Sequence, residues 1–215
     1  MLVATPLLAK AALSQTNLEL LISWQAKNYV PSAYVGKVLP IANTPVIMAL
    51  ELIDNKKIAD ISKKEVRWFA NNQLIQSGIG LKNITFIIPT TRSGDENIKA
   101  VVINYRGTNL EKSIIIPVVN PEVVINAPYP DKKITSGINT FIALPYFFNV
   151  NSLANLAFTW LANNQQVTDT NGNPDILTLD TTGGLSGNQI IVSVTAANIN
   201  NDLELAKQIS ILEIK

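Results

Sequence analysis

The chain has 215 residues, of which 47% are hydrophobic and 15% are charged, and its formal net charge is +1. This composition supports packed cores rather than disorder, and so small a net charge provides no field to attract nucleic acid or an anionic membrane. The sequence contains no cysteine and no histidine. Disulfides, thiolate nucleophiles, zinc–sulfur sites, Ser-His-Asp triads and imidazole metal ligands are therefore excluded.

Residues 1–16 are predicted to form an N-terminal arm or the remnant of a signal peptide. Leu2 to Leu8 is a short apolar run, and Ala9-Lys10-Ala11 has the small-x-small form of a signal-peptidase site. The basic segment that should precede such a run is missing, and Pro6 interrupts it, so a frayed arm or short helix is the alternative. No other stretch approaches the ~18 uninterrupted apolar residues of a membrane span. We expect an extracytoplasmic or cell-surface protein without a membrane span.

Period-two alternation in β-branched runs dominates the rest of the chain, and its 27 isoleucines favour strands over helices. Residues typical of turns separate these runs. Only Ala11 to Trp24 and Ser152 to Ala157 have a composition compatible with helix. We therefore expect an all-β protein. Its clearest predicted strands are Ile84 to Ile88, Ile98 to Tyr105, Ile114 to Val119, Ile176 to Leu179, Ile190 to Thr195 and Ile209 to Ile214.

An internal repeat predicts two domains. The run from Val66 to Gln73 recurs from Phe158 to Gln165, an offset of 92, and both copies carry a tryptophan followed by an Ala-Asn-Asn-Gln sequence. The same offset places the alternating apolar residues that begin at Ile98 over those that begin at Ile190. We expect the boundary near Val119-Asn120-Pro121, because proline cannot donate to a strand ladder. The predicted domains are 17–119 and 120–215, held end to end by a short linker.

Each predicted domain has the pattern of an immunoglobulin-like β-sandwich. Such a sandwich has about 100 residues, about seven strands and a buried tryptophan on its third strand. Trp68 and Trp160 occupy the corresponding place in the two repeats. We expect both to be core residues, with aliphatic packing in place of the missing disulfide.

Several short motifs, taken in order, resemble an uncharacterised group of secreted bacterial proteins with tandem immunoglobulin-like or PKD-like domains. The resemblance covers the chain from about Leu20 to its end and implies the fold, an extracytoplasmic location and an association with type IV pili in small-genome lineages. The chain departs from PKD domains proper, in which a Phe-Gly-Asp-Gly turn follows the tryptophan. No activity or cofactor is implied. The motifs are Trp24-Gln25-Ala26, Tyr29-x-Pro31, Tyr34-x-Gly36-Lys37, Pro40, Trp68-x-x-Asn71, Pro121-Glu122-Val123, Pro145-Tyr146-Phe147-Phe148, Trp160-x-x-Asn163 and Gly172-Asn173-Pro174.

The loop before Asp180 partly matches a calcium-binding loop, in which oxygen side chains alternate along the sequence. Pro174 stands where the calcium loop requires glycine, and a polar turn is the favoured interpretation. The candidate ligands are Asp169, Asn171, Asn173 and Asp175.

Aromatic residues are the other candidate binding groups. Adjacent side chains of a strand point to opposite faces, so at least one of Tyr146, Phe147 and Phe148 should lie away from the core of its own domain. It could bind a sugar ring, contact another subunit or seal the joint between the domains, and the joint is the favoured answer. Tyr29 and Tyr34 flank Pro31 and could line a groove or cap the end of the first sandwich.

The acidic residues are scattered and form no pair of the kind that glycosidases use, so we expect a protein that is not an enzyme and needs no cofactor. Two functions remain. The first is a structural or interaction module of the cell envelope that docks onto other envelope proteins or a surface filament such as a pilus. The second is a carbohydrate-binding module that uses exposed tyrosine and phenylalanine side chains. The oligomeric state is left open.

Overall fold

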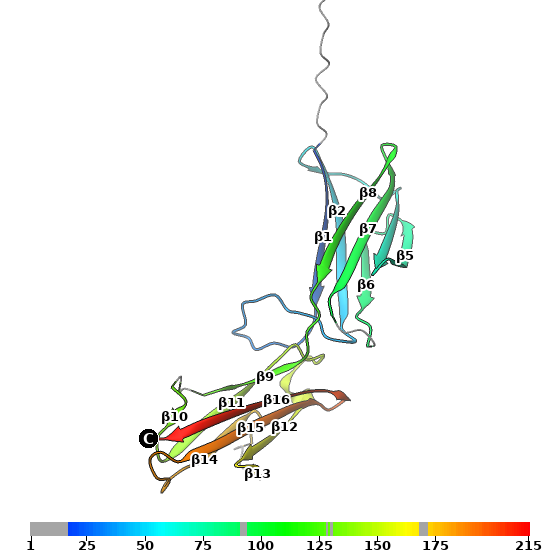
Figure 1. Cartoon of the computed structure of the whole chain (residues 1–215). Coiled ribbons are helices and arrows are strands. Elements are labelled where there is room, and N and C mark those ends of the chain that lie inside the picture. The colour runs from blue at the N-terminus through cyan, green and yellow to red at the C-terminus, as the bar shows by residue number, and fades with distance from the viewer. Residues whose placement is uncertain (1–16, 91–93, 128, 130, 168–171) are drawn as a thin grey trace, which may run out of the picture.

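A computed structural model describes residues 17–90, 94–127, 129, 131–167 and 172–215 of the chain. The described part is built from strands, and its one helical element is a single 3-10 turn, η1 (Leu153–Asn155). Two hydrophobic cores, one on each side of the segment that joins β8 to β9, organise these strands into two sandwiches (Figure 1). Domain 1 and domain 2 denote the first and second sandwich below.

Domain 1 consists of two facing sheets. In one sheet β2 lies between β1 on one side and β3 and β6 on the other, and the second sheet has the order β5-β4-β7-β8. All pairings in these two sheets are antiparallel. The strands are β1 (Leu18–Ala26), β2 (Pro45–Asp54), β3 (Lys57–Ile58), β4 (Glu65–Ala70), β5 (Gln73–Ile79), β6 (Asn83–Ile87), β7 (Glu96–Tyr105) and β8 (Thr108–Ile116).

Domain 2 repeats this arrangement. Its sheets have the orders β9-β11-β14 and β10-β16-β15-β12-β13, and only the short β10 pairs in parallel, with the end of β16. The strands are β9 (Glu122–Asn126), β10 (Lys133–Ile134), β11 (Ile138–Tyr146), β12 (Leu156–Ala162), β13 (Gln165–Val167), β14 (Ile176–Asp180), β15 (Gln189–Asn198) and β16 (Asn201–Ile214).

Alternation of apolar and polar residues explains why these segments are strands. In β2, Val46, Met48 and Leu50 are fully or almost fully buried, while the side chains between them face outward. The period of two puts every second side chain into the space between the sheets. In both domains the tryptophan strand lies between its hairpin partner and a long strand of ten residues, as in immunoglobulin-like sandwiches. The protein is therefore all-β, with two immunoglobulin-like β-sandwiches in tandem.

The two tryptophans lie at the same place in their sandwiches. Trp68 is 0% exposed and Trp160 is 1% exposed. The indole Nε1–H of Trp68 donates to the carbonyl oxygen of Leu81 at 3.0 Å, and that of Trp160 donates to the carbonyl oxygen of Pro174 at 3.1 Å. Each indole ring thus fills the core of its domain, and its only polar atom, Nε1, is hydrogen-bonded to a backbone carbonyl across the sandwich.

The repeated Asn-Asn pair forms the tight turn of a hairpin in each domain. Asn71 and Asn72 have φ angles of 49° and 67°, and Asn163 and Asn164 have 49° and 66°. Two consecutive residues with positive φ make the type I′ turn whose twist matches paired strands, and asparagine tolerates that conformation best after glycine. The amide side chains of Asn71 and Asn163 also accept a backbone N–H from β7 and β15.

The structure corrects two of the sequence-based expectations. Residues 18–24, which are compatible with a helix by composition, belong to strand β1, because β1 pairs along its whole length with β2. The offset of 92 does not extend to β7 and β15. Trp68 pairs with Ala100 but Trp160 pairs with Val194, an offset of 94. The shift is an even number of residues, so the inward face is kept in phase.

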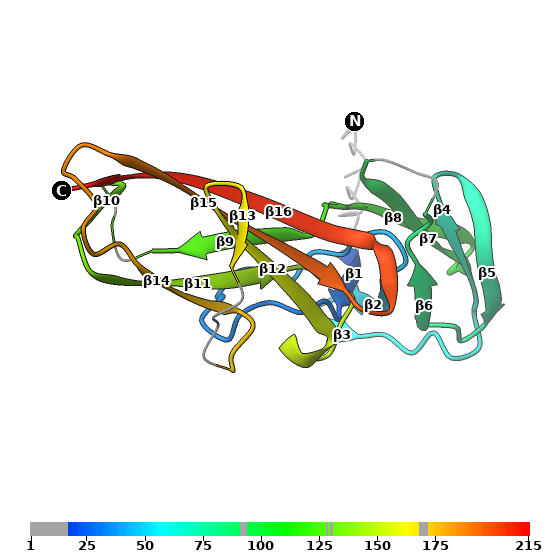
Figure 2. The same cartoon turned by 90° about the horizontal axis from the view of Figure 1, so that it is seen from below.

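The domains meet at an angle. Domain 2 extends sideways from one end of domain 1, and the C-terminus lies at the end of domain 2 that points away from domain 1 (Figures 1 and 2). The loop between β1 and β2 lies at the corner beside domain 2 (Figure 1). No helix among the described residues is long and apolar enough to cross a membrane.

Candidate functional site at the joint between the domains

The long loop between β1 and β2 of domain 1 binds domain 2 through backbone hydrogen bonds. Tyr29 forms an antiparallel bridge with Phe148, just beyond the end of β11. The N–H of Tyr29 donates to the carbonyl oxygen of Phe148 at 2.7 Å, and the N–H of Phe147 donates to the carbonyl oxygen of Tyr29 at 2.7 Å. These two bonds extend strand-like pairing from one domain to the other, so the joint is more than a flexible linker.

A network of side chains reinforces the bridge. The Asn149 amide lies at its centre, where its Nδ2 donates to the carbonyl oxygen of Ala42 at 2.9 Å. Its Oδ1 accepts from Asn28 Nδ2 at 2.8 Å and from Thr44 Oγ1 at 2.7 Å. Asn28 is 7% exposed and Thr44 is 0% exposed. Hydrogen bonds between such buried groups are directional and costly to leave unmade, so they define one relative orientation of the domains.

A buried carboxylate of domain 2 holds the network from the other side. Glu204 lies near the start of β16 and is 4% exposed. Its Oε1 accepts the backbone N–H of Asn149. Its Oε2 accepts from Asn198 Nδ2 at 3.1 Å and from Asn201 Nδ2 at 3.5 Å. Amide donors thus surround the carboxylate, and Glu204 positions the segment that carries Asn149.

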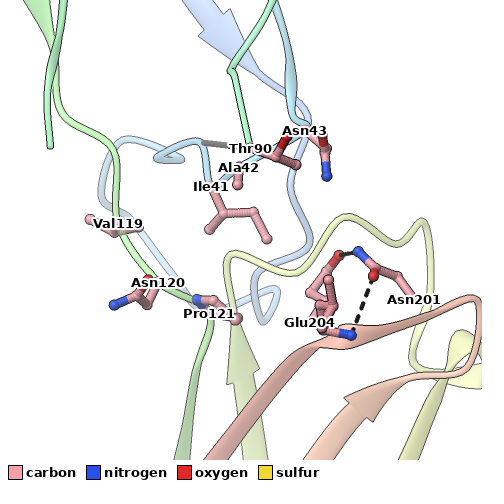
Figure 3. Close-up of a pocket in the computed structure, with 10 residues that line it drawn as sticks. Ile41, Ala42, Asn43, Thr90, Val119, Asn120, Pro121, Asn201 and Glu204 are labelled. Atoms are coloured by element: carbon pink, nitrogen blue, oxygen red, sulfur yellow. Dashed lines mark hydrogen bonds between the residues drawn. The ribbon is translucent and has the colours of Figure 1, made fainter. Parts of the chain in front are cut away.

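A cavity of about 270 Å³ lies beside this network. Figure 3 shows Glu204 and Asn201 on one side of it and the segment of Ile41 and Ala42 on the other, with the linker at Pro121 between the domains. Glu204 is its one titratable lining residue, and both of its oxygens are engaged in hydrogen bonds. The cavity therefore offers shape but no free acid or base.

Three aromatic rings gather at the joint. The ring of Tyr34, from the β1–β2 loop, lies 5.7 Å from that of Tyr146 and 5.8 Å from that of Phe147, at interplanar angles of 72° and 86°. Edge-to-face contacts of this kind stabilise aromatic pairs. The hydroxyl of Tyr34 also donates to the carbonyl oxygen of Lys37 at 3.1 Å. Tyr34 and Tyr146 are half-buried.

The run Tyr146-Phe147-Phe148 does not alternate as a strand would. Strand β11 ends at Tyr146, and Phe147 has a φ of 65°, which turns the chain. Phe147 is 8% exposed at the joint, and Phe148 is 0% exposed within the core of domain 2. Tyr29 packs against the same core, and its burial, with a smaller contribution from the charge of Asp175, raises the pKa of its hydroxyl. Of the five candidate aromatic residues, three are thus partly accessible.

Two of the candidate calcium ligands, Asp169 and Asn171, lie outside the described residues. The other two contribute backbone atoms to the turn before β14. The carbonyl oxygen of Asn173 accepts from the N–H of Ile176 at 3.0 Å, and that of Asp175 accepts from the N–H of Ala143 at 2.7 Å. Within the described ranges, no group of three or more His, Cys, Asp or Glu side chains lies close enough to hold a metal ion.

No pattern in the sequence predicted the polar residues of the joint. Asn28 and Asn149 are separated by 121 positions, and Thr44 and Asn149 by 105. Single asparagines and threonines in loops are ordinary turn residues, and no local pattern distinguishes those that become buried. The motifs around Tyr29, Tyr34 and Tyr146 did mark the segments that carry them.

Comparisons with solved structures find tandem domains of the same general class. The fibronectin(III)-like modules of Clostridium thermocellum CbhA match at 15% identity over 90% of this chain and 93% of that one, with a TM-score of 0.30. Three N-terminal domains of the highly immunogenic outer capsid protein of bacteriophage RB49 match at 10% identity over 92% and 59%, with a TM-score of 0.49. The tandem Ig repeats of Dlar match at 11% identity over 91% and 97%, with a TM-score of 0.28.

No protein-family model matches the chain, and no curated protein matches it. All three TM-scores lie below 0.5, so the assignment of the fold depends on the strand order and the placement of the tryptophans described above.

Proposed function

We propose that this protein is a non-enzymatic interaction module of the cell envelope, located outside the cytoplasm, that docks onto other envelope proteins or a surface filament such as a pilus. Residues 17–119 and 120–215 are its two domains, and the joint between them holds both as one angled body. The role is to present two sandwich surfaces at a set angle.

The hydrogen-bonded joint is the observation that carries the proposal. Domains connected only by a linker and a small polar interface move relative to one another by default. Here two backbone bonds between Tyr29 and the 147–148 segment act together with the half-buried amide of Asn149. A body with one fixed angle favours binding of an extended partner, because neither domain loses interdomain freedom when both make contact.

The carbohydrate-binding alternative requires aromatic rings that a sugar can stack on. Phe147 and Phe148 are buried, and Tyr34 meets Tyr146 at 72°, so these two accessible rings do not form one flat platform. We therefore favour the interaction function. A glycan screen distinguishes the two, since binding that is lost in Tyr34→Ala and Tyr146→Ala but kept in the surface variant Lys112→Ala would support the carbohydrate function.

Cross-linking on intact native cells tests the proposal directly. A membrane-impermeant, lysine-reactive reagent reaches the chain only if it lies outside the cytoplasm, and exposed lysines occur in both domains, for example Lys57 and Lys132. Mass spectrometry should identify links from these lysines to envelope or filament proteins. A chain that is abundant in the lysate but carries no link, while a known surface protein of the same cells does, would contradict both the location and the docking function.

A further inference from the structure

The outer face of the larger sheet of domain 2 is apolar, although no other part of the chain that the structure describes covers it. Strands β12, β15 and β16 lie side by side there (Figure 2). Leu161, Ser193 and Ile209 form one row across the three strands, and Ile191 pairs with Ile211 in the next. The outer face comprises Ala157, Thr159, Leu161, Ile191, Ser193, Thr195, Ala197, Leu205, Lys207, Ile209 and Ile211. Among these, Lys207 is the one charged residue; Glu213, the next outward residue of β16 after Ile211, lies at the end of the face and pairs with Lys133 at 3.2 Å.

The large side chains of this face are exposed to solvent. Leu205 is 52% exposed, Ile209 is 53% exposed and Ile211 is 52% exposed. All three belong to β16 and point to the same side, because they are separated by even numbers of residues. A contiguous apolar patch of this kind on a soluble domain is unfavourably hydrated and marks a surface that another molecule covers.

Domain 1 provides an internal comparison, because the same strand order presents the equivalent face. At the position of Thr159 it has Arg67, at that of Ser193 it has Lys99, and at that of Lys207 it has Glu111. Arg67 also pairs with Glu65 on the same strand at 2.7 Å. The fold therefore does not require an apolar outer sheet, and the difference is specific to domain 2.

We propose that the outer β12–β15–β16 face binds the same face of a second copy of this chain, so that the protein forms a two-fold dimer through domain 2. This inference goes beyond the proposed function, because self-association requires no envelope partner. An isologous interface needs a patch that is complementary to itself, and an apolar surface that carries Lys207 alone among its central rows meets that condition.

The size of the face suits a stable dimer. The residues of this face on β15 run from Ile191 to Ala197 and span about 20 Å, and three strands with side chains extend about 15 to 20 Å across the sheet. The projected area is thus about 300 to 400 Å², and the relief of the exposed side chains brings the accessible area toward the ~600 Å² per partner at the lower end of standard interfaces. Two such sheets would pack about 10 Å apart, like the two layers of a sandwich.

The position of Lys207 fits the two-fold arrangement. Lys207 lies in the row of Thr159 and Thr195, one row from Ser193. A two-fold axis that crosses the strands at the level of Ser193 brings the Lys207 row of one copy opposite the Ile211 row of the other. The two ammonium groups then lie on opposite sides of the axis, and each lysine can lay its aliphatic stem over the facing isoleucine.

Analytical ultracentrifugation of the full chain tests the dimer. Interfaces of this size bind with micromolar affinity or better, so at about 50 μM the chain should sediment with twice its mass of 23.4 kDa. Ile211→Lys should weaken the dimer about 100-fold, because a second like charge would be desolvated in the apolar face. Ile115→Lys is the matched control, since Ile115 has the equivalent position in domain 1 and is 64% exposed.

Circular dichroism must first establish that both variants fold, as expected for exposed positions. A wild-type chain that stays monomeric at this concentration would overturn the proposal. A dimer that survives Ile211→Lys but is lost in Ile115→Lys would overturn it as well, because it would place the interface on domain 1. The chain has no cysteine, so Thr159→Cys and Arg67→Cys each take one spin label. In the proposed dimer, the spin labels of two Thr159→Cys copies should lie a short distance apart. A short distance that occurs only between Arg67→Cys copies would contradict the proposed dimer.

Discussion

Replacement of Asn149 by alanine is expected to loosen the joint between the domains. The substitution removes the donor to Ala42 and the acceptor for Asn28 and Thr44. Each hydrogen bond contributes about 0.5 to 1.5 kcal/mol net, and buried partners left unsatisfied add to the cost. Three bonds among buried and half-buried groups therefore correspond to a loss of about 2 to 4 kcal/mol in the free energy of unfolding. The exposed Asn151 supplies the control variant Asn151→Ala, which should unfold like the wild type.

Two measurements separate a loss of stability from a change in geometry. Urea unfolding, followed by tryptophan fluorescence, gives the change in free energy from the shift of the midpoint at constant slope. Spin labels on Lys112→Cys and Thr140→Cys, which are exposed in domains 1 and 2 and lie away from the proposed dimer face, give the interdomain distance by electron paramagnetic resonance. A single narrow distribution should become broad in Asn149→Ala. If the urea midpoint and the distribution both stayed at their wild-type values, the hydrogen-bond network would not be what holds the joint.

Trp68→Ala and Trp160→Ala should each lower the free energy of unfolding in urea by about 3 to 5 kcal/mol, because each removes a large core side chain. A variant that unfolds at the wild-type urea midpoint would refute the core role of its tryptophan. Because Asn164 has a φ of 66°, Asn164→Val should cost about 1 to 2 kcal/mol in thermal unfolding while Asn164→Gly is tolerated, and equal stability of the two would contradict the turn assignment. Burial is the main cause that raises the pKa of Tyr29 and Tyr105 above 10.0. The folded state holds these protons more tightly, so this stabilisation is present below pH 10.0 and is lost as the pH rises through the folded-state pKa values. The urea midpoint should fall there, and an equally steep fall in the Tyr29→Phe, Tyr105→Phe double variant would exclude these tyrosines as its cause.

Local patterns in the sequence were sufficient for the strands and for the class of fold. The segment from Ile98 to Tyr105 alternates and forms most of β7, and Ile176 to Leu179 lies within β14. The repeated Asn-Asn turn after each tryptophan pointed to two similar sandwiches, because type I′ turns and β-branched strands are encoded by neighbouring residues. Such signals need no knowledge of distant partners.

Ambiguity began where the local pattern allowed more than one structure. The residues of β1 have a composition that suits a helix as well as a strand, and pairing with β2 decides the outcome. The pairing of Trp160 with Val194 likewise depends on the length of the chain between the two strands. That length differs between the repeats, so a single sequence offset cannot align both strands.

The contacts at the joint and the grouping of apolar residues on the outer face of domain 2 depend on the tertiary structure alone. Asn28 and Asn149 are ordinary polar residues until folding brings their side-chain amides within 2.8 Å of each other and buries Asn28. Ile209 and Leu161 belong to separate strands that become neighbours of Ser193 only when β15 pairs with both. The sequence by itself determined which residues alternate and where the chain turns, because those preferences are local. The contacts between domains and across strands depend on the path of the whole chain, which brings together residues that no sequence window contains.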